Sequence, residues 1–162
     1  MNSSLIIGCF ITFLLLGLHV QAQSFKEVTE LGKPFRFEVA AAAQWTYYKL
    51  NVDTLLAGMS STDAINFYVT PYAGDVDLFI SANAFPASRS CADCWKSTSP
   101  HGDIVSINRN DARWPTSPAF FYIGVYSVSR SRFTFNTLLK SSMSFLYENQ
   151  KKLTPVFFSK CF

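Results

Sequence analysis

The sequence contains little of what an enzyme active site needs. It has two histidines, and one of them, His19, lies in an apolar N-terminal segment, which leaves His101 as the candidate base. Neither a Gly-x-Ser-x-Gly elbow nor an oxyanion loop accompanies His101, so a Ser-His-Asp triad has no supporting context. We therefore expect no enzymatic activity, and a solvated loop histidine at position 101.

Charge and long apolar runs are also scarce. Charged residues make up 15% of the chain, and the net charge of +3 comes from basic residues that are scattered rather than grouped. Such a balance does not favour binding to nucleic acid. After residue 22 no apolar run approaches the roughly 20 residues that a membrane-spanning helix needs. The sequence therefore predicts a released protein with neither a nucleic-acid partner nor a membrane span.

One apolar segment, Leu5 to Val20, lies at the N-terminus. Small or β-branched residues at Val20 and Ala22 suit cleavage by signal peptidase after Ala22, and the apolar core is too short for a membrane anchor. We expect residues 1–22 to be a cleaved signal peptide and the protein to be secreted and extracellular. Removing these 22 residues from 162 leaves 140, enough for one domain with its own core.

Cysteine is sparse, and three of the four cysteines follow residue 22. Cys91 and Cys94 are expected to form a disulfide within one loop, because their Ser- and Pro-rich surroundings lack the strand-to-helix context of a redox motif. A zinc site would have only His101 and Cys161 as further ligands, which gives three ligands close in sequence and a distant fourth, so the disulfide is favoured. Cys161 is then unpaired, which indicates an intermolecular disulfide or a missing partner.

The chain does contain a series of short segments with the alternation of β-strands. Turns rich in Gly, Pro, Asn and Ser separate them, and 16% of the residues are aromatic. This pattern predicts an all-β fold, an antiparallel, jelly-roll-like β-sandwich of seven or eight strands, over residues 23–139. The expected strands include Lys33–Val39, Trp45–Val52, Ala64–Thr70, Gly74–Ser81, Asp103–Arg109, Phe120–Ser127 and Arg132–Leu138.

The alternation also predicts which side chains face the core. Trp45 and Tyr47 are expected to point inward, and so are Leu50 and Val52 after a bulge. Phe120–Ser127 is apolar on both faces, which indicates a central strand. The serine- and proline-rich segment Ala82–Gly102 is typical of an irregular surface loop. Other residues predicted to face the core are Ile65, Phe67, Val69, Val76, Leu78 and Ile80.

A tail, residues 140–162, follows the last expected strand. A short helix is expected over Ser142–Leu153, because serines precede it and Pro155 lies beyond its end. The tail either packs back across the sandwich or is the truncated end of a longer protein. An unpaired Cys161 fits the second interpretation.

Two motifs carry a resemblance to a known family. Gly74-Asp75-Val76-Asp77-Leu78-Phe79-Ile80 resembles the signature of the bacterial pre-peptidase C-terminal (PPC) domain, and Tyr122–Tyr126 with Phe133–Phe135 resembles its closing strands. The resemblance covers roughly Gly32 to Leu139. Within this range, Trp95–Ser97 and Asp103–Ile107 are similar to variants of the domain in secreted protist proteins. It implies a β-sandwich of the kind appended to secreted peptidases and surface proteins, some of which bind collagen or polysaccharide. Two departures are Pro118-Ala119 before a strand where the family has glycine, and the absence of a preceding peptidase.

Asp75 and Asp77 stand two residues apart, so a strand places both carboxylates on one face. With loop carbonyls they form a candidate calcium site, since calcium prefers oxygen ligands. The alternative is that Asp75 caps the turn while Asp77 accepts hydrogen bonds at the edge of the sandwich. No DxDxDG loop accompanies the pair, and the alternative is therefore favoured. Calcium is the one cofactor that the sequence leaves open.

Trp95 and Trp114 lie in segments expected to be loops, which makes them candidates for an exposed binding surface. Indole rings stack on sugars and on proline-rich peptides with a small loss of side-chain entropy. The alternative, which we favour, is that these tryptophans pack at the end of the sandwich. The sequence thus predicts a secreted, non-catalytic module that binds an extracellular polymer, either polysaccharide or matrix protein, or a surface partner. An accessory domain that aids folding, secretion or assembly of a larger protein is the alternative function.

Overall fold

The computed structural model describes residues 24–141. The expected signal peptide, the expected helix over Ser142–Leu153 and Cys161 lie outside the described residues, and the predicted domain limits remain predictions. The described part contains nine strands and one helix of four residues. In chain order these are β1 (Lys26–Val28), β2 (Phe35–Ala40), β3 (Gln44–Asn51), α1 (Val52–Leu55), β4 (Ala64–Ala73), β5 (Val76–Ser81), β6 (Trp95–Ser97), β7 (Asp103–Asn108), β8 (Phe120–Ser127) and β9 (Ser131–Lys140).

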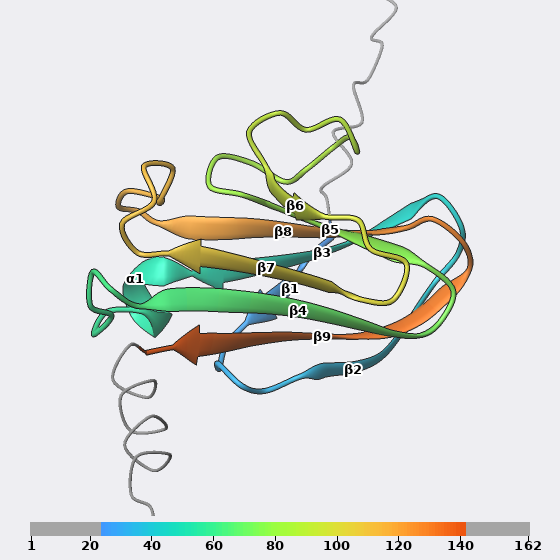
Figure 1. The fold of residues 1–162 in the computed structure, drawn as a ribbon, viewed down its shortest axis with the longest axis horizontal. Helices are drawn as coiled ribbons and strands as arrows, with labels where there is room; N and C mark the ends of the chain where they lie inside the picture. Colours follow the sequence, from blue (N-terminus) through green and yellow to red (C-terminus); the bar gives the residue numbers. More distant parts are fainter. Residues whose placement is uncertain (1–23, 142–162) are drawn as a thin grey trace, which may run out of the picture.

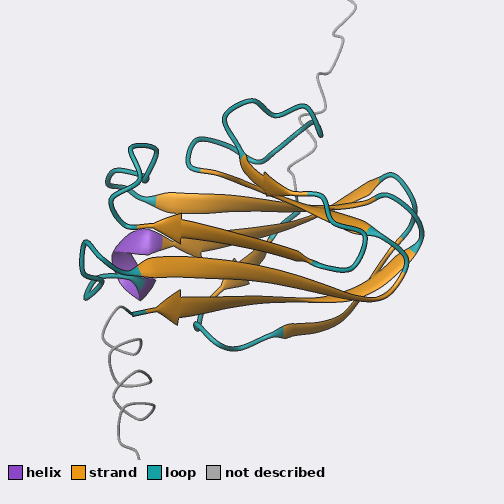
Figure 2. Cartoon of the chain, in the orientation of Figure 1, coloured by secondary structure: helices purple, strands orange, loops and turns teal. Residues whose placement is uncertain are grey.

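The strands form two sheets that pack face to face, which confirms the predicted β-sandwich (Figure 1). One sheet has the order β1-β3-β8-β5-β6 and the other the order β2-β9-β4-β7. Neighbouring strands are antiparallel except β1 and β3, which are parallel. Figure 2 shows how little of the described chain is helical. Within residues 24–141 no helix is long and apolar enough to cross a bilayer.

Aromatic rings from both sheets make the core between them. Phe67 of β4 meets Phe121 of β8 edge to face at 5.5 Å between ring centroids, and Tyr48 of β3 stacks on Phe135 of β9 at 4.2 Å. Each fully buried side chain of this size contributes about 2–3 kcal/mol through its removal from water. The central position predicted for Phe120–Ser127 is confirmed, because β8 lies between β3 and β5.

The five-stranded sheet is also covered on its outer face. All six residues of β5 are buried, because the segment 82–94 folds back over this face. Trp45 packs against Phe79 at 5.3 Å between centroids, and the hydroxyl of Tyr47 donates to the carbonyl of Pro86. At Gly124 a Cβ atom would lie 2.9 Å from the ring of Trp45, so only glycine fits beneath the indole.

This second layer explains why the prediction is wrong for Trp45 and Tyr47, whereas Leu50 and Val52 are buried as expected. Trp45 and Tyr47 were expected in the core, but they lie on the outer face, and Tyr48 and Leu50 are fully buried between the sheets. The pairing of β3 with β8 runs without a bulge. Because both faces of β3 carry aromatic residues, alternation alone does not distinguish the inner face from the outer one.

The first expected strand and the long loop also differ from prediction. The alternation of Phe35, Phe37 and Val39 does not give one buried face, because β2 is bulged between Phe35 and Glu38 and the side chains of Phe37 and Val39 are exposed. The expected loop Ala82–Gly102 contains the three-residue strand β6. Strands as short as β1 and β6 show too few repeats for a period to be recognised.

The α1 and 109–119 segments lie at one end of the sandwich, joined by the hydrogen bond from the Val52 amide to the Ala119 carbonyl (Figure 1). At the other end the β4–β5 turn contacts the β8–β9 connection, where the amide of Val128 donates to the carbonyl of Asp75 at 2.9 Å. Gly74 forms this contact with φ +76°, in the left-handed region that favours glycine.

We expect Gly74→Ala to lower the free energy of unfolding by more than about 2 kcal/mol, because strain at positive φ adds to a steric overlap. A Cβ atom at this position would overlap the carbonyl oxygen of Arg130 and lie 2.8 Å from the Cα of Ser131. Urea unfolding measures the change. Gly58→Ala is the matched control, because nothing lies within 4 Å of its Cβ position and its φ is not positive. Equal stability of the two variants would contradict the role of Gly74.

Candidate functional site

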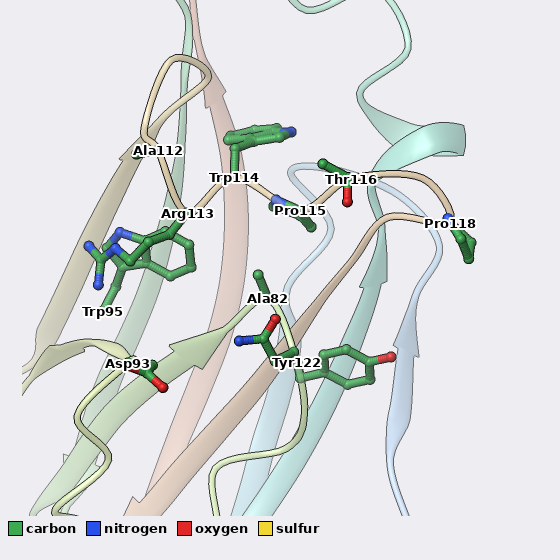
Figure 3. A pocket seen from close by; sticks show the side chains of 11 residues that line it. Ala82, Asp93, Trp95, Ala112, Arg113, Trp114, Pro115, Thr116, Pro118 and Tyr122 are labelled. Carbon is green, nitrogen blue, oxygen red and sulfur yellow. The ribbon is translucent and has the colours of Figure 1, made fainter.

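An open hollow of about 610 Å³ lies at the end of the sandwich that carries the 109–119 segment. Four parts of the chain meet there: the residues that follow β5, the start of β6, the 109–119 segment and β8 (Figure 3). Its walls combine indole rings, prolines and polar side chains. The lining residues are Ala82, Asn83, Asp93, Trp95, Ala112, Arg113, Trp114, Pro115, Thr116, Pro118 and Tyr122.

Asp111 organises one wall of the hollow. Its Oδ2 accepts a hydrogen bond from the indole Nε1 of Trp95 at 3.0 Å, and its Oδ1 accepts one from the backbone amide of Arg113 at 2.9 Å. The guanidinium of Arg113 lies over the Trp95 ring, 4.3 Å from its centroid, as Figure 3 shows. The carboxylate thus fixes an indole and a cation against each other at the rim.

The charge of Asp111 is maintained by these contacts. Partial burial acts to raise the pKa of this carboxyl, but the hydrogen bonds from the Arg113 amide, the Trp95 indole and the Arg113 side chain together lower it below its ordinary value. A carboxylate that accepts several hydrogen bonds is stabilised in its ionised form. Asp111 therefore remains an acceptor for Trp95 over the whole neutral and mildly acidic range.

Trp114 forms the second indole wall. Its ring meets Phe121 edge to face at 5.1 Å, and the guanidinium of Arg109 lies 4.9 Å from the ring centroid. The indole Nε1 is buried and has no hydrogen-bond partner. Trp114, Pro115 and Thr116 also line an adjoining hollow of about 550 Å³ that reaches Asp53 and α1. The three residues thus lie between two adjoining depressions at one end of the molecule.

The structure brings Trp95 and Trp114 together and shows the packing that was favoured over exposure. Both side chains are only 8% exposed, and Trp95 begins β6 rather than lying in an irregular loop. Both rings pack edge to face on Phe121, at 5.9 Å and 5.1 Å between centroids. Most of each ring is therefore packed against the core, as the packing alternative expects. The part of each residue that remains accessible lines the hollow.

The sequence interpretation missed the polar members of the site, Asp111 and Arg113, and also Asn83, Thr116 and Tyr122. One signal was available. The run Asn110-Asp111-Ala112-Arg113-Trp114-Pro115-Thr116 mixes both charges with an indole and a proline between two strands. Loops of this composition, held by the ends of strands, are frequent positions for binding residues.

Asp75 lies in the turn before β5, as the alternative expects, whereas Asp77 lies on β5, between β8 and β6 rather than at an edge. Asp77 is buried, with a side chain that is 3% exposed, and its Oδ2 accepts from Arg89 Nε at 3.0 Å and pairs with Arg89 Nη2 at 2.7 Å. Asp75 acts through its main chain, since its carbonyl accepts from the Ser131 hydroxyl and its amide donates to Ser129 Oγ. Within residues 24–141 no group of three or more His, Cys, Asp or Glu could hold a metal ion. Calcium binding remains an untested prediction.

The predicted disulfide between Cys91 and Cys94 is present, with 5.5 Å between the two Cα atoms. It closes a short loop that contains Asp93, which contributes to the lining of the hollow. His101 is exposed in a turn before β7, and its backbone amide donates to Ser99 Oγ at 3.4 Å. The loop placement expected for His101 is therefore confirmed.

The fold and the site define an all-β sandwich module with an aromatic and polar hollow at one end. No family model matches the sequence, and no curated protein matches it. Among solved structures the chain is similar to the pre-peptidase C-terminal domain of a collagenase from Bacillus anthracis, with a TM-score of 0.41 and 11% identity over 73% of this chain and 96% of that one. A likeness at this level carries no further argument, and the PPC assignment remains a resemblance.

A second buried carboxyl, Asp103 in β7, makes stability depend on pH. It is fully buried, its Oδ1 accepts from the Ser97 hydroxyl and the Ser99 amide, and its Oδ2 has no partner. Burial raises the pKa of Asp103, and despite the two hydrogen bonds the value stays above normal, with a further increase from Asp77 and Asp75. Burial likewise raises the pKa of Asp77, against the influence of Arg89.

We expect stability to fall as the pH rises above about 4, the ordinary aspartate pKa. In that window the unfolded chain has released protons that folded Asp103 and Asp77 still hold, so raising the pH favours unfolding. Asp103→Asn removes one of these groups and should make the decline shallower. Urea midpoints between pH 4 and 7 measure the slope, and parallel profiles for the variant and the unmodified protein would contradict the assignment.

Proposed function

We propose that this chain is a secreted, non-catalytic β-sandwich module that binds an extracellular polymer at the hollow between Trp95 and Trp114. The observation that carries the proposal is Trp114, which lines two adjoining depressions and whose buried indole N–H has no partner. A buried donor without an acceptor costs free energy, and a ligand oxygen placed there would remove that cost. The N-terminal apolar segment and the Cys91–Cys94 disulfide support an extracellular location.

The chemistry of the walls favours a polysaccharide over a matrix protein. Arg113 and the Trp114 N–H are donors, the side chain of Asp93 is an acceptor, and Asn83 and Thr116 serve as both. Sugar hydroxyl groups also donate and accept, so such a mixed lining can satisfy several of them at once. The accessible edge of each indole offers an apolar surface for the C–H face of a sugar ring.

The shape of the site suits a polymer rather than a small molecule. The two depressions of about 610 and 550 Å³ share Trp114, Pro115 and Thr116, and both are open to solvent. A chain of sugars could occupy one depression, cross the shared residues and continue into the other. The rings of Trp95 and Trp114 are held by Asp111 and Phe121, so little side-chain entropy is lost on binding.

The test is a polysaccharide and matrix-protein array with the full secreted chain, followed by titration calorimetry with the best ligand. Trp114→Phe keeps the ring packing on Phe121 but removes the N–H, and Arg113→Gln removes the charge. We expect each variant to bind about 10-fold more weakly, the loss of roughly one good hydrogen bond.

Ile104→Ala is the matched control, because Ile104 is exposed on β7 and lines neither depression. Its affinity should equal that of the unmodified protein. Absence of binding to every polymer on the array, or full affinity in Trp114→Phe, would overturn the proposal.

A further inference from the structure

Two aromatic side chains and an arginine form a second exposed surface, which we call the bulge patch: Phe37, Tyr72 and Arg132. Phe37 and Tyr72 are 63% and 56% exposed, yet their rings stack on each other, with centroids 6.2 Å apart and an interplanar angle of 27°. The guanidinium carbon of Arg132 lies 5.9 Å from one ring centroid and 6.0 Å from the other. The patch is therefore an ordered group of side chains rather than separate surface residues.

Two β-bulges create the patch. In β2 the register shifts between Phe35 and Glu38, and in β4 it shifts between Pro71 and Ala73. Each shift adds one residue opposite the strand β9, which lies between β2 and β4. Phe37 lies within the first bulge, and Tyr72 is the residue inserted in the second. The two irregularities flank the same strand, and each brings an aromatic ring to the surface beside Arg132.

The backbone of Phe37 is strained. Its φ is +59°, a conformation that a bulky side chain rarely adopts and that glycine adopts freely. The ring does not contribute to the core, since it is largely exposed. Strain of this kind persists where the side chain serves a purpose outside folding, which an observed outlier can indicate.

Two further arginines lie close to the patch in the sequence. Arg36 lies in the same bulge as Phe37, and Arg130 lies two residues before Arg132 in the β8–β9 connection. None of these three arginines forms an ion pair with a carboxylate of the described residues. Guanidinium groups without acidic partners are suited to bidentate recognition of a carboxylate or sulfate group.

From these observations we infer that the bulge patch binds an anionic polysaccharide, one that carries carboxylate or sulfate groups. The ring faces of Phe37 and Tyr72 contact the apolar face of a sugar ring, and Arg132 with its arginine neighbours pairs with the acidic substituents. The patch is too small for a stable interface with a protein partner, which needs roughly 20–30 residues on each side. A patch of two stacked aromatic rings and one arginine without an acidic partner among the described residues is small enough for one sugar unit. It therefore suits a linear polymer whose repeating units each offer the same contact.

The patch is distinct from the hollow of the proposed function. Tyr72 is near the end of β4, whereas the amide of Arg109, in the segment that forms the hollow, donates to Asp63 just before β4 begins. The ten residues of β4 separate the two regions by roughly 30 Å. Variants of either region therefore test it separately, and the inference does not rest on the proposed function.

The experiment measures binding of the full chain to immobilised dextran sulfate, carboxymethyl dextran and unmodified dextran at fixed ionic strength. We expect binding to at least one of the two charged polymers and none to neutral dextran. The sulfated and carboxylated forms distinguish which acidic group is recognised.

Phe37→Gly separates binding from stability. Glycine relieves the strain at φ +59°, so the variant should unfold at the same or a higher urea concentration, while its dissociation constant for the charged polymer rises at least 10-fold. Arg132→Gln should produce a loss of similar size.

Lys140→Gln is the charge-matched control, because this substitution also removes one positive charge. Lys140 is exposed at the far end of β9 from Arg132. It should change the dissociation constant less than twofold. Unaltered binding in Phe37→Gly would overturn the inference. So would an equal loss in Arg132→Gln and Lys140→Gln, which would indicate general attraction of opposite charges, or a failure to bind either charged polymer.

Discussion

The edge-to-face packing around Phe121 supports both the sandwich and the hollow at its end. This ring meets Phe67 from the facing sheet and, in the same geometry, the indoles of Trp95 and Trp114. Contacts of this type add about 0.5–1.5 kcal/mol each beyond the burial of area. Because the same ring joins the two sheets and supports both indole walls, the site is an extension of the core rather than a feature added to loops.

The central elements of the fold could be predicted from the sequence. The strands β4, β5, β8 and β9 carry long apolar alternation or continuous apolar runs, and each appears where it was expected. The inward positions of Ile65, Phe67 and Val69 follow directly from a period of two. The disulfide followed from spacing and context, because two cysteines three residues apart in one loop have few other uses in an oxidising compartment.

The remainder depended on tertiary contacts that local patterns do not contain. The inner face of β3 is decided by the segment 82–94, which covers the outer face and gives Trp45 a second place to be buried. The bulge at Phe37 could not be predicted, because the apolar and polar residues alternate through it without interruption. Trp95 and Trp114 were recognised as a pair of interest, but the residue that holds them, Asp111, belongs to a loop whose path is decided by the strands on either side.

The close contact of Gly124 with Trp45 has a consequence for the history of this sequence. The space beneath the indole is shared by three parts of the chain, since a Cβ at position 124 would meet both Trp45 and the ring of Pro86. A larger residue at 124 is compatible with the fold only if the residue at 45 becomes smaller or the covering segment moves away. In descendants of a common ancestor, positions 45, 86 and 124 should therefore change together, and their joint variation would record whether the outer layer was gained or lost as a unit.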